Sequence, residues 1–157
     1  MCIRDRDYTV QNNNLSGSGA AAGEPALYLN ALTVNSNLVI NGNTFGGANF
    51  NTGIRVENTS DLLISDGTVS GTHIGVTTAN GLGNATGNAL YLVNLTRTKV
   101  QNMDLSFTTA TKTGVGIQIT TNFGTTSQVE MKSLTVKNRV DGINIASGAN
   151  HSVKCSD

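Results

Sequence analysis

The sequence has little of what marks most globular domains. Its 157 residues include one proline, no tryptophan, 4% aromatic residues and 13% charged residues. Scarce proline favours strands in which every backbone amide is needed for hydrogen bonds to neighbours on both sides. Scarce charges and aromatics suit a narrow core of stacked aliphatic side chains.

The sequence also has no excess of charge of either sign, because it contains ten Lys and Arg residues and ten Asp and Glu residues. There is no basic cluster interleaved with aromatics, which nucleic-acid-binding proteins use. No apolar run approaches the roughly 18 residues that a membrane-spanning helix needs. We therefore expect neither a nucleic-acid partner nor membrane insertion.

Metal-ligating residues are sparse as well. His73 and His151 have no partners at metal-ligand spacing, and the calcium-binding pattern Gly-Gly-x-Gly-x-Asp is absent. We expect no metal and no cofactor.

What the sequence does contain is a strand signature that recurs about every 27 residues. Its copies are Ala26 to Leu29, Gly53 to Val56, Ala89 to Leu92, Val115 to Ile119 and Gly142 to Ile145. A strand of this length cannot bury its apolar side alone, so the repeat predicts a solenoid whose coils stack on one another. The equivalent residues should form one column: Leu27, Ile54, Leu90, Ile117 and Ile143.

A second motif lies between these copies. It has an apolar residue at its first position, a second apolar residue two positions on and a third seven positions on. The copies are Leu38, Ile40 and Phe45; Leu62, Ile64 and Val69; Val100, Asn102 and Phe107, with Asn102 as the polar exception; and Val129, Met131 and Val136. Alternate strand residues face opposite sides, so Val39, Leu63, Gln101 and Glu130 should face outward. Thr44, Thr68, Ser106 and Thr135 should form an outward hydroxyl stripe, and Val153 begins a fifth copy.

Asparagines follow the first motif at a fixed place. Asn58 and Asn94 each lie two residues past their strand, with Thr121 and Ser147 at the same offset. Asparagine adopts the left-handed conformation readily, and its amide can bond to the equivalent residue of the next coil. The pattern predicts a polar ladder inside the turn, and the alternative is an ordinary turn preference.

Two strand motifs per turn, joined by Asn, Gly, Ser and Thr, resemble the right-handed parallel β-helix of the pectate-lyase-like superfamily. The resemblance covers roughly residues 26–155 and depends on Gly-Ile-x-Val followed by Val-x-Ile-x-x-x-x-Phe, as in Gly53 to Val56 and then Leu62 to Val69. It implies an all-β, single-stranded, right-handed parallel β-helix of about five coils. No amphipathic helix that could cap the stack is evident at either terminus, so we expect an incomplete fragment.

Three ranges divide the chain. Residues 1–6 resemble a translated sequencing adapter and are set aside together with Cys2, which leaves Cys155 without a disulfide partner. Residues 7–25 are expected to form a loop or a partial first coil. Residues 26–157 are expected to form the β-helix coils, truncated at the C-terminus, with a loop or short extra coil around residues 72–88.

Candidate functional residues must face outward, because the inward ones form the core. One such residue per coil gives a stripe of Tyr28, Arg55, Tyr91, Gln118 and Asn144, with Glu57 and Asp61 beside it. Tyrosine rings stack on sugar rings, and Arg, Gln and Asn bind hydroxyls or carboxylates. In the superfamily that the chain resembles, the groove over this face commonly binds polysaccharide. The alternative is that these side chains only cover the sheet.

Catalytic residues are not evident. The hydrolase motifs of that superfamily, Asn-Thr-Asp, Asp-Asp and Gly-His-Gly, do not occur. A minimal lyase site could combine Arg55 with Glu57 and Asp61, but one arginine near two acids is more often an ion pair. We expect no catalytic residue within this sequence.

The expected function is that of a structural, adhesive or carbohydrate-binding segment of an extracellular or cell-surface protein from a bacterium or its phage. Its partner would be a polysaccharide or a cell-surface glycan, besides the rest of the parent chain at both ends. The alternative is the non-catalytic portion of a polysaccharide lyase or glycoside hydrolase.

Overall fold

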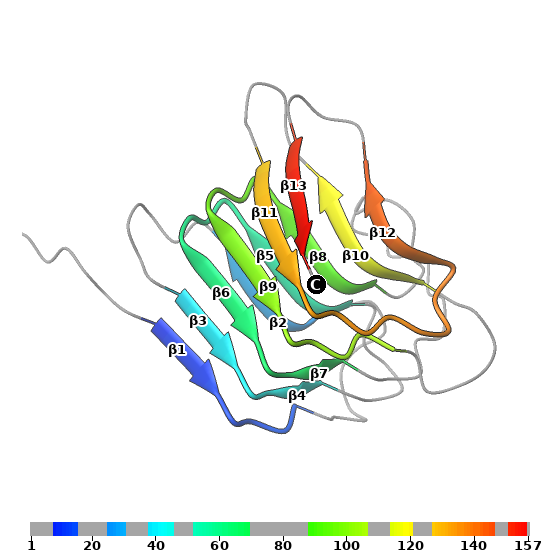
Figure 1. The fold of residues 1–157 in the computed structure, drawn as a ribbon. Helices are drawn as coiled ribbons and strands as arrows, with labels where there is room; N and C mark the ends of the chain where they lie inside the picture. Colours follow the sequence, from blue (N-terminus) through cyan, green and yellow to red (C-terminus); the bar gives the residue numbers. More distant parts are fainter. Residues whose placement is uncertain are drawn as a thin grey trace, which may run out of the picture.

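The computed structural model describes residues 8–15, 25–30, 38–45, 52–69, 88–106, 114–120, 127–146 and 151–156. Within these ranges the chain forms strands and turns but no helix, so none of them contains a helix that could span a membrane. Every strand pairing among them is parallel (Figure 1). The chain is therefore an all-β parallel solenoid, as the repeats predict.

The recurring strand signature forms a five-stranded sheet. In stacking order its strands are β2 (Pro25–Asn30), β5 (Thr52–Glu57), β8 (Asn88–Val93), β10 (Val115–Thr120) and β12 (Asp141–Ile145). Pairing places Leu27, Ile54, Leu90, Ile117 and Ile143 in one column, so this prediction is confirmed. The three central residues of the column are fully buried, whereas Ile143 on the last strand is 40% exposed.

The second motif forms a six-stranded sheet. Its strands are β1 (Tyr8–Gln11), β3 (Leu38–Asn41), β6 (Leu62–Ser65), β9 (Thr98–Gln101), β11 (Ser127–Lys132) and β13 (His151–Ser156). Val153 pairs with Val129 and Cys155 with Met131, in the register expected for a fifth copy of the motif. Strand β1 lies inside residues 7–25, so the stack already includes residues before the first copy of the signature.

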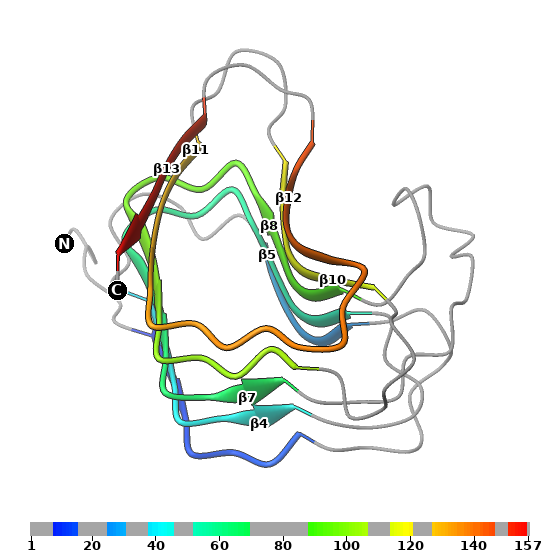
Figure 2. The same cartoon turned by 45° about the vertical axis from the view of Figure 1, so that its right-hand side comes forward.

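A third side of each coil is short. It consists of β4 (Thr44–Phe45) and β7 (Thr68–Val69), and isolated bridges continue it from Thr68 to Asp104 and from Asp104 to Thr135. Figure 2 shows the two larger sheets on opposite sides, with β4 and β7 between them. The described ranges make about three turns of the solenoid, slightly fewer than the five that the sequence predicts. Strands of the partly described outer coils extend both sheets beyond these three turns.

The predicted register of the third coil is wrong by two residues. Val100 pairs with Ile64, and Thr98 pairs with Val129, so the copy runs through Thr98, Val100 and Leu105. A polar threonine in the first core position conceals the motif, and Asn102 is an exposed corner residue. Consequently Lys99, and not Gln101, is the outward residue between Leu63 and Glu130. Asp104 takes the position predicted for Ser106 between Thr68 and Thr135, so the predicted hydroxyl stripe contains a carboxylate. Phe107 lies outside the described residues.

The corner after the six-stranded sheet requires a left-handed backbone conformation. The residue that follows each of its first five strands has a positive φ between 52° and 63°: Asn12, Gly42, Asp66, Asn102 and Ser133. Glycine and short polar side chains adopt this left-handed conformation at lowest cost. The backbone amides of the first four donate to carbonyls of the adjacent coil, as Asp66 N does to Gln101 O over 3.2 Å, so the ladder of hydrogen bonds continues around the corner.

Among the described residues, one cationic side chain is buried. Arg139 is 6% exposed, and its guanidinium donates to Leu105 O over 2.8 Å and to Val69 O over 3.3 Å. Burial lowers the pKa of Arg139 to about 10, so the side chain remains charged at neutral pH. It connects the backbone of two coils near the third side of the stack.

Candidate functional site

Five outward side chains of the predicted site lie in one column on the five-stranded sheet. Strand pairing aligns Tyr28 with Arg55, Arg55 with Tyr91, Tyr91 with Gln118, and Gln118 with Asn144. The inward neighbours on these strands fill the core, which holds the outward residues about one strand spacing, or roughly 4.8 Å, apart. We call these five residues the outer column.

Arg55 lies between two tyrosines in this column. Its Cζ is 5.1 Å from the centroid of the Tyr28 ring and 5.3 Å from that of the Tyr91 ring. Both distances fall within the range of cation–π attraction. The three side chains therefore form a stack that runs along the solenoid axis.

Glu57 neutralises this arginine. Arg55 Nε donates to Glu57 Oε1 over 2.6 Å, and Nη2 donates to the same oxygen. The two side chains are only 12% and 13% exposed. The rings of Tyr28 and Tyr91 flank Arg55, and the Tyr28 hydroxyl contacts Glu57. The ion pair is thus partly shielded from water, unlike a pair on an open surface.

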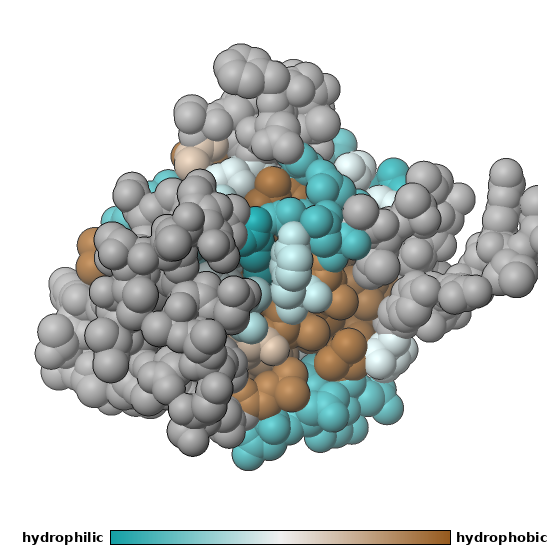
Figure 3. All heavy atoms as spheres, turned by 180° about the vertical axis from the view of Figure 1, so that it is seen from behind, coloured by the Kyte–Doolittle hydropathy of each residue, from teal (hydrophilic) through white to brown (hydrophobic). Residues whose placement is uncertain are grey.

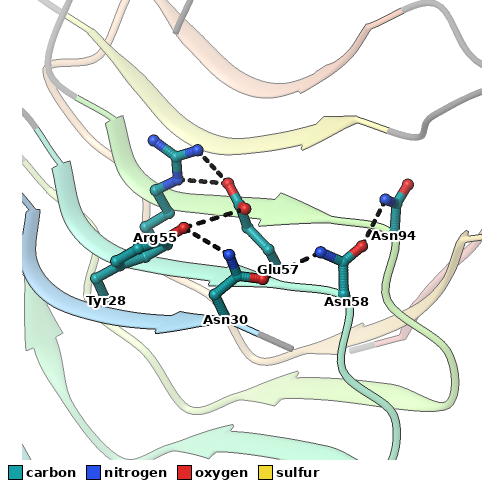
Figure 4. A network of polar contacts seen from close by, with 6 residues as sticks. All are labelled: Tyr28, Asn30, Arg55, Glu57, Asn58 and Asn94. Atoms are coloured by element: carbon teal, nitrogen blue, oxygen red, sulfur yellow. Dashed lines mark hydrogen bonds and ion pairs between the residues drawn. The ribbon is translucent and has the colours of Figure 1, made fainter. Parts of the chain in front are cut away.

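A chain of hydrogen bonds leads from the ion pair to the turn (Figure 4). Tyr28 Oη donates to Glu57 Oε2 over 3.3 Å, and Asn30 Nδ2 donates to Tyr28 Oη over 2.9 Å. Asn58 Nδ2 donates to Asn30 Oδ1 over 3.1 Å, and Asn94 Nδ2 donates to Asn58 Oδ1 over 2.8 Å.

The predicted asparagine ladder is therefore confirmed for Asn58 and Asn94. Both have positive φ, 50° and 52°, as the prediction requires. Thr121 and Ser147 lie outside the described residues. Asn30 also belongs to the ladder, because its Oδ1 accepts from Asn58 Nδ2. The sequence pattern does not predict this contact, because Asn30 is the last residue of β2 and not a turn residue like Asn58.

Asp61 is separate from this network. Arg97 clamps it with two hydrogen bonds of 2.6 Å, from Nε to Oδ1 and from Nη2 to Oδ2. The Arg97 guanidinium lowers the pKa of Asp61 and the carboxylate raises that of Arg97. Arg97 was missed from the sequence, although Asp61 and Arg97 are separated by the same 36 residues as Asn58 and Asn94.

Exposure is concentrated at one end of the outer column. Tyr28 is 48% exposed, whereas Tyr91, Gln118 and Asn144 are partly buried. Figure 3, which views the molecule from behind, shows hydrophobic residues directly beside hydrophilic ones on the described surface. At the exposed end of the column, Tyr28 supplies an aromatic ring, and Asn30 and Asn58 supply exposed amides.

Two features bear on cofactors and family. Within the part of the chain that the structure describes, no three His, Cys, Asp or Glu residues lie where they could hold a metal ion. His73 falls outside the described residues, as does the side chain of His151. Comparison of the chain with protein-family models, with curated proteins and with solved structures finds no match in any of the three.

Proposed function

We propose that this chain is a carbohydrate-binding segment of an extracellular or cell-surface protein, in which the parallel solenoid presents a rigid glycan-binding face. We also propose kinship with the right-handed β-helices of the pectate-lyase-like superfamily. That kinship is supported by the fold together with the alternation of the two strand motifs.

The observation that carries the proposal is the outer column itself. Five consecutive strands each contribute one side chain of a type suited to sugar recognition, and strand pairing aligns them along the axis. A polysaccharide is also a linear repeat, so it can contact several rungs at once. Repeated contacts of modest strength add up along such a ligand.

The column is also held in place before any ligand arrives. Arg55 is fixed by two rings and a carboxylate, and Tyr28 Oη bonds to both Glu57 and Asn30. Side chains that are already ordered lose little conformational entropy on binding. This rigidity favours recognition of an extended surface ligand.

Binding is better supported than catalysis. Glu57 and Asp61 are the two acids of the candidate site, and each is engaged by its own arginine. A general acid or base needs a carboxyl that can exchange protons with a substrate. The arrangement therefore favours a binding or adhesive role.

The test replaces the two rings. Tyr28→Ala combined with Tyr91→Ala should lower affinity for a bound polysaccharide at least tenfold, measured by affinity electrophoresis or calorimetry over a panel of acidic and neutral polymers. Lys99→Ala, on the outward face of the six-stranded sheet, is the control and should leave affinity unchanged. Unchanged binding by a folded double variant would remove the outer column as the site.

A further inference from the structure

We infer that the glycan bound by the outer column is a neutral polysaccharide and not a uronate polymer. The inference rests on the proposed function and adds the chemical class of the ligand. It follows from what surrounds the one cation of this face.

The cationic group of the face is already occupied. Arg55 offers its Nε and Nη2 donors to Glu57, and its guanidinium carbon lies over the rings of Tyr28 and Tyr91. With 12% of the side chain exposed, little of the guanidinium is accessible to a second carboxylate. Recognition of uronates by arginine usually uses a planar fork of donors, and here the fork of Nε and Nη2 already holds Glu57. The low exposure of the side chain restricts access to the remaining donors on Nη1.

The described strands of this face carry no net charge on their outward positions. From the fourth residue of each of the five described strands onward, the outward positions are Tyr28, Asn30, Arg55, Glu57, Tyr91, Val93, Gln118, Thr120 and Asn144. Arg55 and Glu57 are the only charged residues among them, and they pair with each other. An incoming carboxylate would meet Glu57 without a compensating free cation, and like charges at close range repel.

The groups that remain on the face are neutral. Tyr28 exposes nearly half of its surface, and Asn30 and Asn58 are exposed amides. Each amide carries two N–H donors and a carbonyl with two lone pairs, and the ladder uses one N–H of each. The remaining amide donors and acceptors can bind the hydroxyls of a neutral sugar, and the aromatic ring beside them can pack against its apolar C–H face.

The experiment compares acidic polysaccharides with neutral ones, including pairs that share a backbone. Binding of the full chain is measured to polygalacturonate and its methyl-esterified form, to carboxymethyl and hydroxyethyl cellulose, and to unmodified neutral glucans, galactans and mannans. We expect at least one neutral polymer to bind, at least tenfold tighter than any acidic one. Raising NaCl from about 50 mM to about 500 mM, which shortens the screening length well below 10 Å, should leave that affinity unchanged.

The possible results separate the two proposals. Tighter binding of an acidic polymer, or an affinity that falls steeply with salt, would overturn the neutral ligand class while leaving glycan binding intact. Binding to no polymer would overturn both.

A substitution tests directly whether the ion pair of Arg55 and Glu57 disfavours acidic polymers. Glu57→Gln removes the carboxylate that neutralises Arg55 but keeps a side chain of similar size. It should increase affinity for polygalacturonate at least fivefold and make binding of that polymer sensitive to salt. Arg55→Gln combined with Glu57→Gln should abolish this gain, and failure of Glu57→Gln to produce any gain would contradict the role assigned to the ion pair.

Discussion

The guanidinium carbon of Arg55 lies 5.3 Å from the ring centroid of Tyr91, on the neighbouring strand of the five-stranded sheet. This contact joins two successive coils through their outward side chains. It holds the arginine in place from one side while Tyr28 holds it from the other. The pair is therefore a structural element of the solenoid as well as part of the candidate site.

A double-mutant cycle measures this contact. Arg55→Met and Tyr91→Leu should each destabilise the fold, and their coupling free energy should be about 0.5–2 kcal/mol, the range for a cation–π pair shielded from water. Urea unfolding of the four proteins gives the value. Arg55→Met with Gln118→Leu, one strand farther away, is the control and should be additive; a coupling near zero for Arg55 and Tyr91 would show that the contact is not formed.

Thr98→Val should stabilise the protein by about 1 kcal/mol. Thr98 is 1% exposed, pairs with Val129 in the core, and its hydroxyl has no hydrogen-bond partner among the described residues. Burying an unsatisfied hydroxyl costs about 1–3 kcal/mol, which the valine avoids at nearly the same volume. Thermal unfolding provides the measurement.

Thr59 provides the matched control for this substitution. Thr59 is 3% exposed, and its hydroxyl donates to Glu57 O over 2.9 Å. Thr59→Val should therefore destabilise by about 0.5–1.5 kcal/mol. If both variants moved stability in the same direction, the difference in hydrogen bonding would not be the cause.

Gly53→Ala should destabilise the fold by about 1–3 kcal/mol, because the space between Gly53 and the adjacent coil is too small for a methyl group. A Cβ at Gly53 would lie 2.7 Å from Ala89 O and would also overlap Val69 Cγ1. Gly142 occupies the equivalent position on β12, the outermost strand of the sheet, and a Cβ there meets no atom within 4 Å. Gly142→Ala should change the unfolding free energy by less than about 0.5 kcal/mol; equal effects of the two substitutions would contradict the packing of adjacent coils.

Arg97→Gln should raise the pKa of Asp61 toward its ordinary value. The Arg97 hydrogen bonds are the main cause of the lowered pKa, and the pair is exposed, so its effect on stability is small. Because the folded-state pKa of Asp61 is below the unfolded one, the stabilisation is present above the unfolded pKa and is lost as pH falls through the folded pKa. Carbon-detected NMR titration of the Asp61 carboxyl tests this, with Lys137→Gln as a control that should have no effect.

Much of the fold could be predicted from spacing and alternation. The column from Leu27 to Ile143 could be predicted because each of its members is aliphatic, follows Ala or Gly, and precedes an outward polar or aromatic residue. The third coil was misaligned because Thr98 places a polar residue where the other copies have an apolar one. A pattern of apolar residues cannot identify a core position that holds a hydroxyl.

The candidate site was predicted less completely. Alternation places Arg55 and Glu57 on the same side of one strand, but it does not reveal that two tyrosine rings flank Arg55 or that the ion pair is only 12–13% exposed. The clamp between Asp61 and Arg97 depends on turn residues with positive φ, whose direction is not encoded by strand periodicity. Side-chain partners in turns were therefore the part that sequence reasoning missed.

The stacking of coils in register, which creates the outer column, is tested most directly by methyl NOE spectroscopy on a protein with labelled Ile and Leu. Adjacent strands are about 4.8 Å apart, and strands two coils apart are separated by about 9.6 Å. We expect strong cross-peaks between Ile54 and Leu90 and between Leu90 and Ile117, with a weak or absent one between Ile54 and Ile117. Absence of the first two cross-peaks in the folded protein would contradict the register and the outer column that depends on it.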